Sequence, residues 1–237
     1  EPLASYRSSS TAALYYTHAP TEEIEARSRL IEYLQDEGQR WAVIPSEDLA
    51  GINREYRRRT GRHLYVADGR STRLLLVAAE PVDGRSNKNF IADHVLTQVP
   101  EIGHPLKVSF ADRVELLGYD LDLPEEDYVG AGQRFSLTWF WRVTGAPPKG
   151  YQVFVHVDGF GQRMNGDHVP VHGEYPIKYW EKGDLIVDRQ ELTVPANYSV
   201  GDYVIYVGLF KGDQRLDVVS GPNDGGNRVR AGVLHVR

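Results

Sequence analysis

The first eighty residues alternate between apolar spacing typical of helices and short apolar runs typical of strands. Residues 21–37 open with Thr21 and acids, and their apolar positions repeat at helical spacing until Gly38, which predicts a helix. Ser46 is placed to cap a second helix that ends near Arg59. The apolar runs predict strands at 13–16, 41–45, 63–68 and 73–78. Strands and helices in this order predict a small α/β domain over residues 1–80.

From residue 108 onward the hydrophobic period changes to two. In the stretch "RFSLTWFWRV" (134–143) every second side chain is apolar, including Trp139 and Trp141, which are expected in the core. Seven or eight such runs without a helix predict an antiparallel β-sandwich over 108–237, either immunoglobulin-like or jelly-roll. Residues 81–107 have three prolines and mixed polarity, which predicts an interdomain connection with at most one short element near 90–96. The fold class is therefore an α+β chain of two domains.

Composition narrows the function. The net charge of -6 provides no bulk positive field, so nucleic acid is not an expected partner. The absence of cysteine excludes disulfides, thiolate zinc sites and cysteine nucleophiles. No apolar run approaches the roughly 18 residues of a membrane-spanning helix. The chain begins with Glu1 and holds a single methionine, Met164, which favours a processed chain or a piece of a longer one.

The segment "HVDGFGQRMNGDHVPVHGEYP" (156–176) concentrates histidines, acids and glycines. Ordinary hairpin chemistry explains "DGFG" (158–161) as a turn that Asp158 begins, with glycine supplying a positive φ and the aspartate bonding its own backbone. The alternative is a calcium ion held by Asp158, Asn165 and Asp167, because oxygen ligands from one loop suit a hard cation. We prefer this calcium hypothesis to the zinc alternative described below, and otherwise no cofactor is expected.

The same segment raises a zinc hypothesis for two of its histidines. His168 and His172 are four residues apart, the spacing of a zinc pair on a helix, but Pro170 and Gly173 argue against a helix. A loop histidine that hydrogen-bonds backbone is the favoured interpretation of His168.

The stretch "GEYPIKYW" (173–180) places Tyr175, Tyr179 and Trp180 near Glu174. Aromatic rings on the rim of a sandwich can stack on a sugar, with a carboxylate and His156 taking its hydroxyls. The alternative, which we favour, is that Trp180 closes the end of the sandwich as part of the core.

The basic run "REYRRRTGR" contains Arg57, Arg58 and Arg59 at the end of the second predicted helix. Positive charge there complements the helix dipole. The functional alternative is contact with anionic headgroups or a lipid-linked phosphate.

The second half resembles a known family. The motifs "VELLGYDLD", "LTWFW", "VFVHVDG", "YPIKYWEKGDLIVD" and "GDYVIYVGLF" are similar to the extracytoplasmic C-terminal region of bacterial polytopic membrane glycosyltransferases of the protein O-mannosyltransferase and aminoarabinose-transferase-like group. The pattern over 151–195 is distinctive, whereas "LYYTH", "WAVIPSEDL" and "LYVAD" in the first half match more softly.

This resemblance implies a non-catalytic tail on the periplasmic face of a bacterial inner membrane, joined to a membrane-embedded remainder of the same polypeptide. The parent enzyme would use a polyprenyl-phosphate sugar, and the tail would position a glycan or protein acceptor or stabilise the enzyme. No catalytic residue is assigned to the chain itself. The alternative function is a free-standing carbohydrate-binding or adhesion module, and a third is a secreted hydrolase using Asp167 and Glu174.

Overall fold

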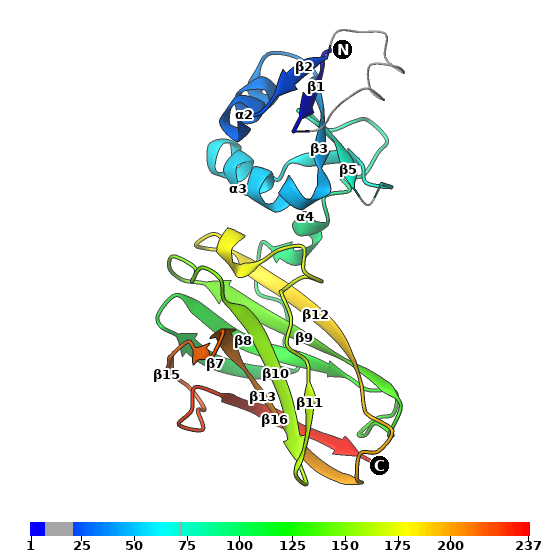
Figure 1. Ribbon diagram of the computed structural model, residues 1–237, viewed down its shortest axis with the longest axis vertical. Coiled ribbons are helices and arrows are strands. Elements are labelled where there is room, and N and C mark those ends of the chain that lie inside the picture. Colours follow the sequence, from blue (N-terminus) through cyan, green and yellow to red (C-terminus); the bar gives the residue numbers. More distant parts are fainter. Residues whose placement is uncertain (8–20, 72) are drawn as a thin grey trace. The chain divides into compact units, whose positions relative to one another are not determined.

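The computed structural model describes residues 1–7, 21–71 and 73–237 (Figure 1). They divide into two compact units, Glu1–Asp93 and His94–Arg237. Strand is the commonest element, and most of the ladders are antiparallel. The strand predicted at 13–16 lies outside the described residues.

The first unit is built on a five-stranded mixed sheet of order β2-β1-β3-β5-β4. The strand β1 pairs in parallel with β2 and β3, whereas β5 pairs antiparallel with β3 and β4. Helices α2 and α3 bury one face each, including Leu30, Ile31 and Ile52. The elements are β1 (Leu3–Tyr6), β2 (Glu22–Ile24), α2 (Arg27–Gln35), β3 (Trp41–Pro45), the 3-10 turn η1 (Ser46–Asp48), α3 (Leu49–Thr60), β4 (Tyr65–Asp68) and β5 (Leu74–Ala78).

The helix predicted over 21–37 is shorter than expected and begins later. Glu22–Ile24 instead forms β2, because its backbone pairs with β1 and Ile24 is buried. The acids after Thr21 therefore do not belong to the first turn of a helix. Helical spacing continues through a strand here because a three-residue strand is too short to show its own period.

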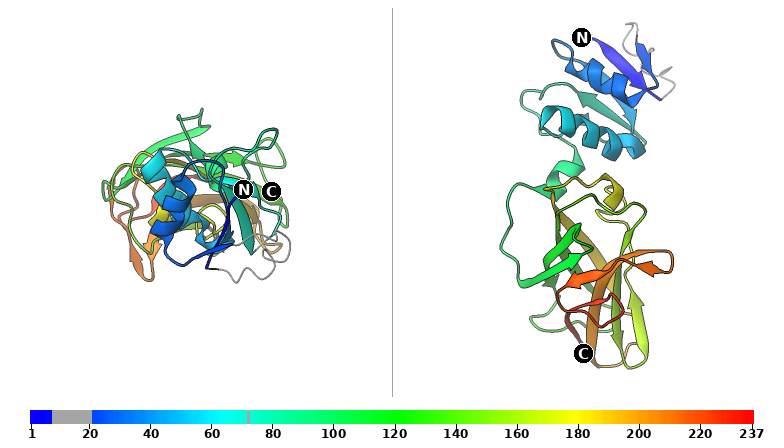
Figure 2. Two further views of the ribbon diagram at one scale, coloured as in Figure 1. Left: turned by 90° about the horizontal axis from the view of Figure 1, so that it is seen from above. Right: turned by 90° about the vertical axis from the view of Figure 1, so that its left-hand side faces the viewer.

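The second unit consists of antiparallel ladders arranged in two sheets, as predicted for this half (Figure 2). One sheet has the order β15-β7-β8-β9-β12-β6, and the other runs β11-β10-β13-β14 with β16 also paired to β13. The elements are α4 (Phe90–His94, which starts in the first unit), β6 (Val95–Leu96), β7 (His104–Phe110), β8 (Val114–Asp122), β9 (Arg134–Val143), β10 (Gln152–Gly159), β11 (Gln162–Asn165), the 3-10 turn η2 (Ile177–Tyr179), β12 (Leu185–Thr193), β13 (Gly201–Lys211), β14 (Gln214–Arg215), β15 (Val218–Ser220) and β16 (Val229–Val236).

The core of this unit lies between the two sheets, the arrangement of a β-sandwich. Trp139 and Trp141 of β9 are fully buried, which confirms their expected place in the core. The sheets approach closely where Tyr119 of β8 meets Gly232 of β16, since a Cβ at Gly232 would overlap the tyrosine hydroxyl. Large aromatic side chains thus fill the space that valines on β10 and β13 leave.

Two strands of the second unit are absent from the sequence prediction. The strand β7 begins at His104, inside the range expected as a connection, and β11 follows β10 after two residues. At most one short helix or strand was expected near 90–96, whereas the structure has two short elements there, α4 and β6. Pro105 breaks the alternation at the start of β7, and β11 has only four residues, so neither gives a clear period.

Candidate functional site

The β10–β11 hairpin carries a bulky aromatic residue at its tip. Gly159 pairs with Gln162, so the turn consists of Phe160 and Gly161, with φ of 51° and 72°. Two positive φ angles define a type I′ turn, whose first central position favours Asn, Asp or Gly. A left-handed conformation costs another residue roughly 1–2 kcal/mol. Phenylalanine at this position therefore has an unfavourable backbone conformation.

The turn, residues 159–162, lies one residue later than the sequence predicts. Asp158 was expected to open the turn and bond its own backbone, but it lies in β10 opposite Arg163 of β11. Gly159 does not adopt a positive φ. The observed register places Met164 beside Val157 on the buried face, and it gives Asp158 a cationic partner across the ladder.

Phe160 is 63% exposed, and it is the one aromatic residue among the exposed large hydrophobic residues of the described ranges. It lies over Gly201, where a Cβ would overlap its far edge, and its centroid is 5.4 Å from that of the buried Tyr203. Tyr203 in turn stacks on Tyr198 at 4.8 Å. The ring is supported from one side by glycine and tyrosine while much of its surface faces solvent.

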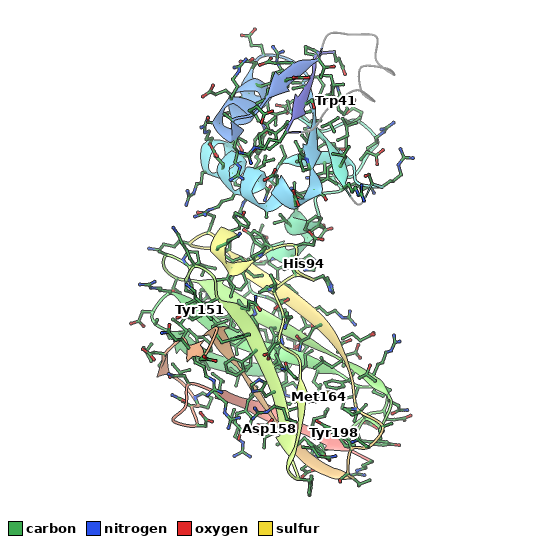
Figure 3. All side chains as sticks on the ribbon, in the orientation of Figure 1. Trp41, His94, Tyr151, Asp158, Met164 and Tyr198 are labelled. Carbon is green, nitrogen blue, oxygen red and sulfur yellow. The ribbon has the colours of Figure 1, made fainter. Side chains whose placement is uncertain are left out.

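Beside this ring is an open hollow of about 440 Å³ lined by residues 158–163. Asp158, which is labelled in Figure 3, lies near the end of β10. Arg163 donates two hydrogen bonds of 2.7 Å to the two carboxylate oxygens of Asp158, and Arg228 donates a third of 2.9 Å. The hydrogen bond from Arg163 is the main reason that the pKa of Asp158 lies below its usual value, so the carboxylate is charged at neutral pH. The hollow therefore combines an aromatic ring, a carboxylate and a guanidinium.

Gln162 fixes the turn end of the hairpin. Its amide nitrogen donates to the Asn197 carbonyl at 2.9 Å, and its amide oxygen accepts from the Ser199 N–H and the Tyr203 hydroxyl, at 3.1 Å and 2.7 Å. These bonds tie the hairpin to the loop before β13. The position of the Phe160 ring is thus defined before any ligand arrives.

His156 and Asp167 form a pair on the same side of β10 as Asp158. The Nε2 of His156 lies 3.3 Å from an Asp167 carboxylate oxygen. Its Nδ1 is buried and has no hydrogen-bond partner among the described residues. Burial is the main cause that lowers the pKa of His156, ahead of the opposing attraction of Asp167. His156 does not line the hollow, and we give it no direct role in binding.

The structure does not bring the candidate calcium ligands together on one ion. Asp158 is bound by two arginines, Asp167 faces His156, and the Asn165 side chain accepts the Asp167 N–H at 2.7 Å. Within the described residues no group of three or more His, Cys, Asp or Glu side chains is arranged to hold a metal ion. A divalent cation beside two guanidinium groups would be repelled, so this arrangement gives calcium no support.

The aromatic residues expected to stack on a sugar near the end of the sandwich are mostly inaccessible. Trp180 and Tyr175 are fully buried, and the Trp180 indole donates to the Tyr175 carbonyl at 3.0 Å. The sugar-stacking hypothesis is wrong for these two rings, and Trp180 belongs to the core. Tyr179 is half-buried beside Lys178, and Glu174 is exposed. Tyr179 and Glu174 therefore do not form a sugar site that combines an exposed ring face with an adjacent carboxylate.

His168 is a structural residue held at both ring nitrogens. Its Nδ1 lies 2.8 Å from the Gly166 carbonyl and its Nε2 lies 2.9 Å from the fully buried Asp188. The second carboxylate oxygen of Asp188 accepts the Val171 N–H at 2.8 Å. The predicted backbone bond of His168 is confirmed, and no zinc pair forms, because His172 is exposed and contacts the ring of His94 instead.

The basic run lies at the end of α3 as predicted, with the Gly61 N–H bonded to the Arg57 carbonyl. Arg59 pairs with Glu55 at 3.0 Å and approaches Glu32 at 3.9 Å. Part of its charge is therefore already balanced within the first unit. Contact of Arg57, Arg58 and Arg59 with phosphate or headgroups stays a prediction.

Comparison with known proteins adds little about function. No protein-family model matches the chain, and no curated protein matches it. Among solved structures, the C-terminal domain of Wzt matches at 10% identity over 58% of this chain and 82% of its own length, with a TM-score of 0.37. The CARDB domain of PF1109 from Pyrococcus furiosus, solved with di-metal ions, matches at 11% identity over 59% and 95% of the two chains, with a TM-score of 0.31. A Niemann-Pick type C2 protein from Japanese carpenter ant matches at 11% identity over 59% and 100%, with a TM-score of 0.30.

All three scores are too low to carry a conclusion about fold family or ligand. The helices within the described ranges are also too short or too polar for any of them to cross a membrane. The case for function therefore depends on the site itself. Sequence reasoning missed Phe160, although an aromatic between two glycines, at a turn position that favours Asn, is a readable signal.

Proposed function

We propose that the unit His94–Arg237 binds a glycan at the β10–β11 hairpin, with a sugar ring stacked on Phe160. The observation that carries this proposal is an exposed phenylalanine in a left-handed turn position. Neither the strain nor the exposure benefits folding. Phe160 combines an unfavourable backbone conformation with an exposed apolar ring, and such a residue is a candidate for function.

The neighbours of Phe160 suit sugar recognition. Asp158 is held charged by its arginines and can accept a hydrogen bond from a hydroxyl, while Arg163 is half-exposed and retains N–H groups to donate. The fixed geometry of the pair means that little side-chain freedom is lost on binding. A pyranose that stacks its C–H face on the ring would place its hydroxyls toward these groups.

The proposal includes the setting that the sequence resemblance implies. The glycan-binding unit would belong to an α+β chain of two domains, the non-catalytic periplasmic part of a bacterial membrane glycosyltransferase that uses a polyprenyl-phosphate sugar. Its partner would be the membrane-embedded remainder of the same polypeptide, and its role would be to hold acceptor glycan. The alternative, a free-standing carbohydrate-binding or adhesion module, uses the same hollow. The gene sequence upstream of Glu1 separates the two, since only the first requires membrane spans there.

A glycan array with matched variants tests the binding. Phe160→Asn removes the ring but keeps a residue that type I′ turns favour, so the hairpin stays folded. Burying roughly 60 Å² of ring face is worth about 1.5 kcal/mol, so the variant should bind its best glycan about tenfold more weakly. Phe160→Trp should bind at least as well as the original chain.

Val219→Asn is the control, because it removes another exposed apolar side chain, on β15, without touching the hairpin. Its glycan binding should be unchanged. The proposal fails if no glycan binds the original chain, or if Phe160→Asn and Val219→Asn bind equally well.

A further inference from the structure

A second hollow in the sandwich unit is lined mainly by apolar side chains. Its volume is about 360 Å³, within the range of small-ligand sites. Val99 and Ile102 come from the segment before β7, Leu106 from β7, and Leu117 from β8. The segment lies close to the sheet at Gly118, where a Cβ would stand 2.7 Å from an Ile102 methyl.

Three irregularities of strand pairing converge on this hollow. The β7–β8 register shifts between Pro105 and Val108, and the β8–β9 register shifts at Leu117. The β15–β7 register also shifts, between Val218 and Ser220. Bulges re-aim side chains and gather next to functional sites. Here the bulges interrupt the ladders at four residues that line the hollow: Leu106, Lys107, Leu117 and Ser220. A regular sheet would not direct these side chains in the same way.

The charged residues of the hollow leave a positive excess. Arg142 pairs with Glu115 at 3.3 Å, which cancels one charge of each sign. Lys107 is exposed and forms no ion pair with any residue in the described ranges. An apolar chain in the hollow would leave its polar end near this lysine. Complementary charge there must be negative.

We propose that this hollow binds a single-chain amphiphile with an anionic head, its alkyl chain against Ile102 and Leu117 and its head paired with Lys107. The shared chemistry is an alkyl carboxylate or an alkyl phosphate. The site is separate from the hairpin hollow and does not depend on glycan binding. Failure of one proposal therefore leaves the other intact.

Titration calorimetry on the full chain tests the site with decanoate, decyl phosphate and neutral decanol. Both anions should bind, and decanol should bind at least fivefold more weakly. Octanoate should bind about fifteenfold more weakly than decanoate, since each buried methylene contributes about fourfold. If one anion binds and the other does not, the head is identified as carboxylate or phosphate.

Variants locate the binding. Leu117→Trp fills the hollow and should weaken decanoate at least tenfold, and Lys107→Glu should remove the preference for anions over decanol. Lys182→Glu makes the same charge change at an exposed turn outside the hollow. It should change neither the affinity for decanoate nor the preference for anions over decanol. Phe160→Asn should also bind normally. Absence of binding by either anion overturns the proposal, as does equal loss in the Lys107 and Lys182 variants.

Discussion

The segment 152–167, which contains the β10–β11 hairpin, and the following segment 168–188, which leads into β12, contain the same kinds of side chains and use them differently. Each segment has a histidine–aspartate pair, and each has a non-glycine residue whose backbone is in the left-handed conformation. In the segment 168–188 Val171 and His172 have positive φ angles of 57° and 52°, and Val171 is the severe outlier because it is β-branched. Val171 is buried, and Asp188 accepts its N–H. In the hairpin the left-handed residue is Phe160, which is exposed.

The two histidines show the same contrast. Both nitrogens of His168 have partners, and its bond to buried Asp188 raises the His168 pKa in spite of the opposing and larger single effect of desolvation. One nitrogen of His156 has none within the described chain, and desolvation lowers its pKa. A nearby carboxylate does not determine a histidine's charge. The histidine's charge depends on how many hydrogen-bond partners it has and on how deeply they are buried. A ligand can bind where polar groups have no partner within the protein.

The largest expected difference in stability between the two segments comes from removing the aspartate of each histidine–aspartate pair. Asp188→Ala leaves the His168 ring and the Val171 N–H without their acceptor inside the protein, so it should cost about 3–5 kcal/mol of unfolding free energy. Asp167→Ala removes a partly exposed partner at 3.3 Å and should cost no more than about 1 kcal/mol. Urea unfolding measures both.

Asp188→Asn serves as the control, because it keeps an oxygen for Val171 and should lose less than Asp188→Ala. Equal losses in the Asp188→Ala and Asp167→Ala variants would show that the two regions are held alike, contrary to the contrast drawn here.

The pH dependence of stability should separate the histidines by sign. The folded pKa of His168 is raised, so its stabilisation is complete below about pH 6.5, the unfolded pKa, and is lost as pH rises through the folded pKa. The folded pKa of His156 is lowered, so the folded state loses stability as pH falls below about 6.5 toward that pKa. Unfolding at a series of pH values should find His168→Gln flatter on the alkaline side and His156→Gln flatter on the acid side.

Each histidine variant is the control for the other. A His156→Gln profile that changes only above pH 7 would contradict the assignment, because it would mean that folding favours the protonated imidazole at that position.

The smallest expected effect is a gain. Phe160→Asn relieves a left-handed phenylalanine and gives up only a mostly exposed ring, so it should stabilise the chain by about 0.5–1 kcal/mol. Thermal unfolding should give a slightly higher Tm. The same variant should lose glycan binding, so stability and binding move in opposite directions. A variant that is clearly less stable would mean that the ring is there for packing.

Alternation along the strands was enough to predict most of the second unit. Residues 134–143 were expected as a strand and form β9 with those bounds, because the period and the burial are both local properties. The short β2 could not be predicted, since its evidence is pairing with β1 rather than its own pattern.

The site was less accessible to sequence reasoning. Asp158 is bound by Arg228, seventy positions away in the chain, and nothing local indicates that contact. The acidity and aromatic content of 156–180 were recognised, and the favoured core position of Trp180 is confirmed, since the residue is fully buried beside Trp141. The position of the turn could not be predicted, because it depends on the register of β10 with β11, which places Phe160 rather than Gly159 at the first central position.

The glycine under the Phe160 ring has a consequence for sequence comparison between relatives. Any side chain at Gly201 would occupy the space that the ring fills. Homologues that keep an aromatic residue at position 160 should therefore keep glycine at 201. The φ of 150° at Gly201 favours glycine there as well, so the informative homologue is one with a side chain at 201, and it should lack the aromatic ring at 160. Such a pairing would record selection on the contact between the ring and the glycine, at two positions that no local motif connects.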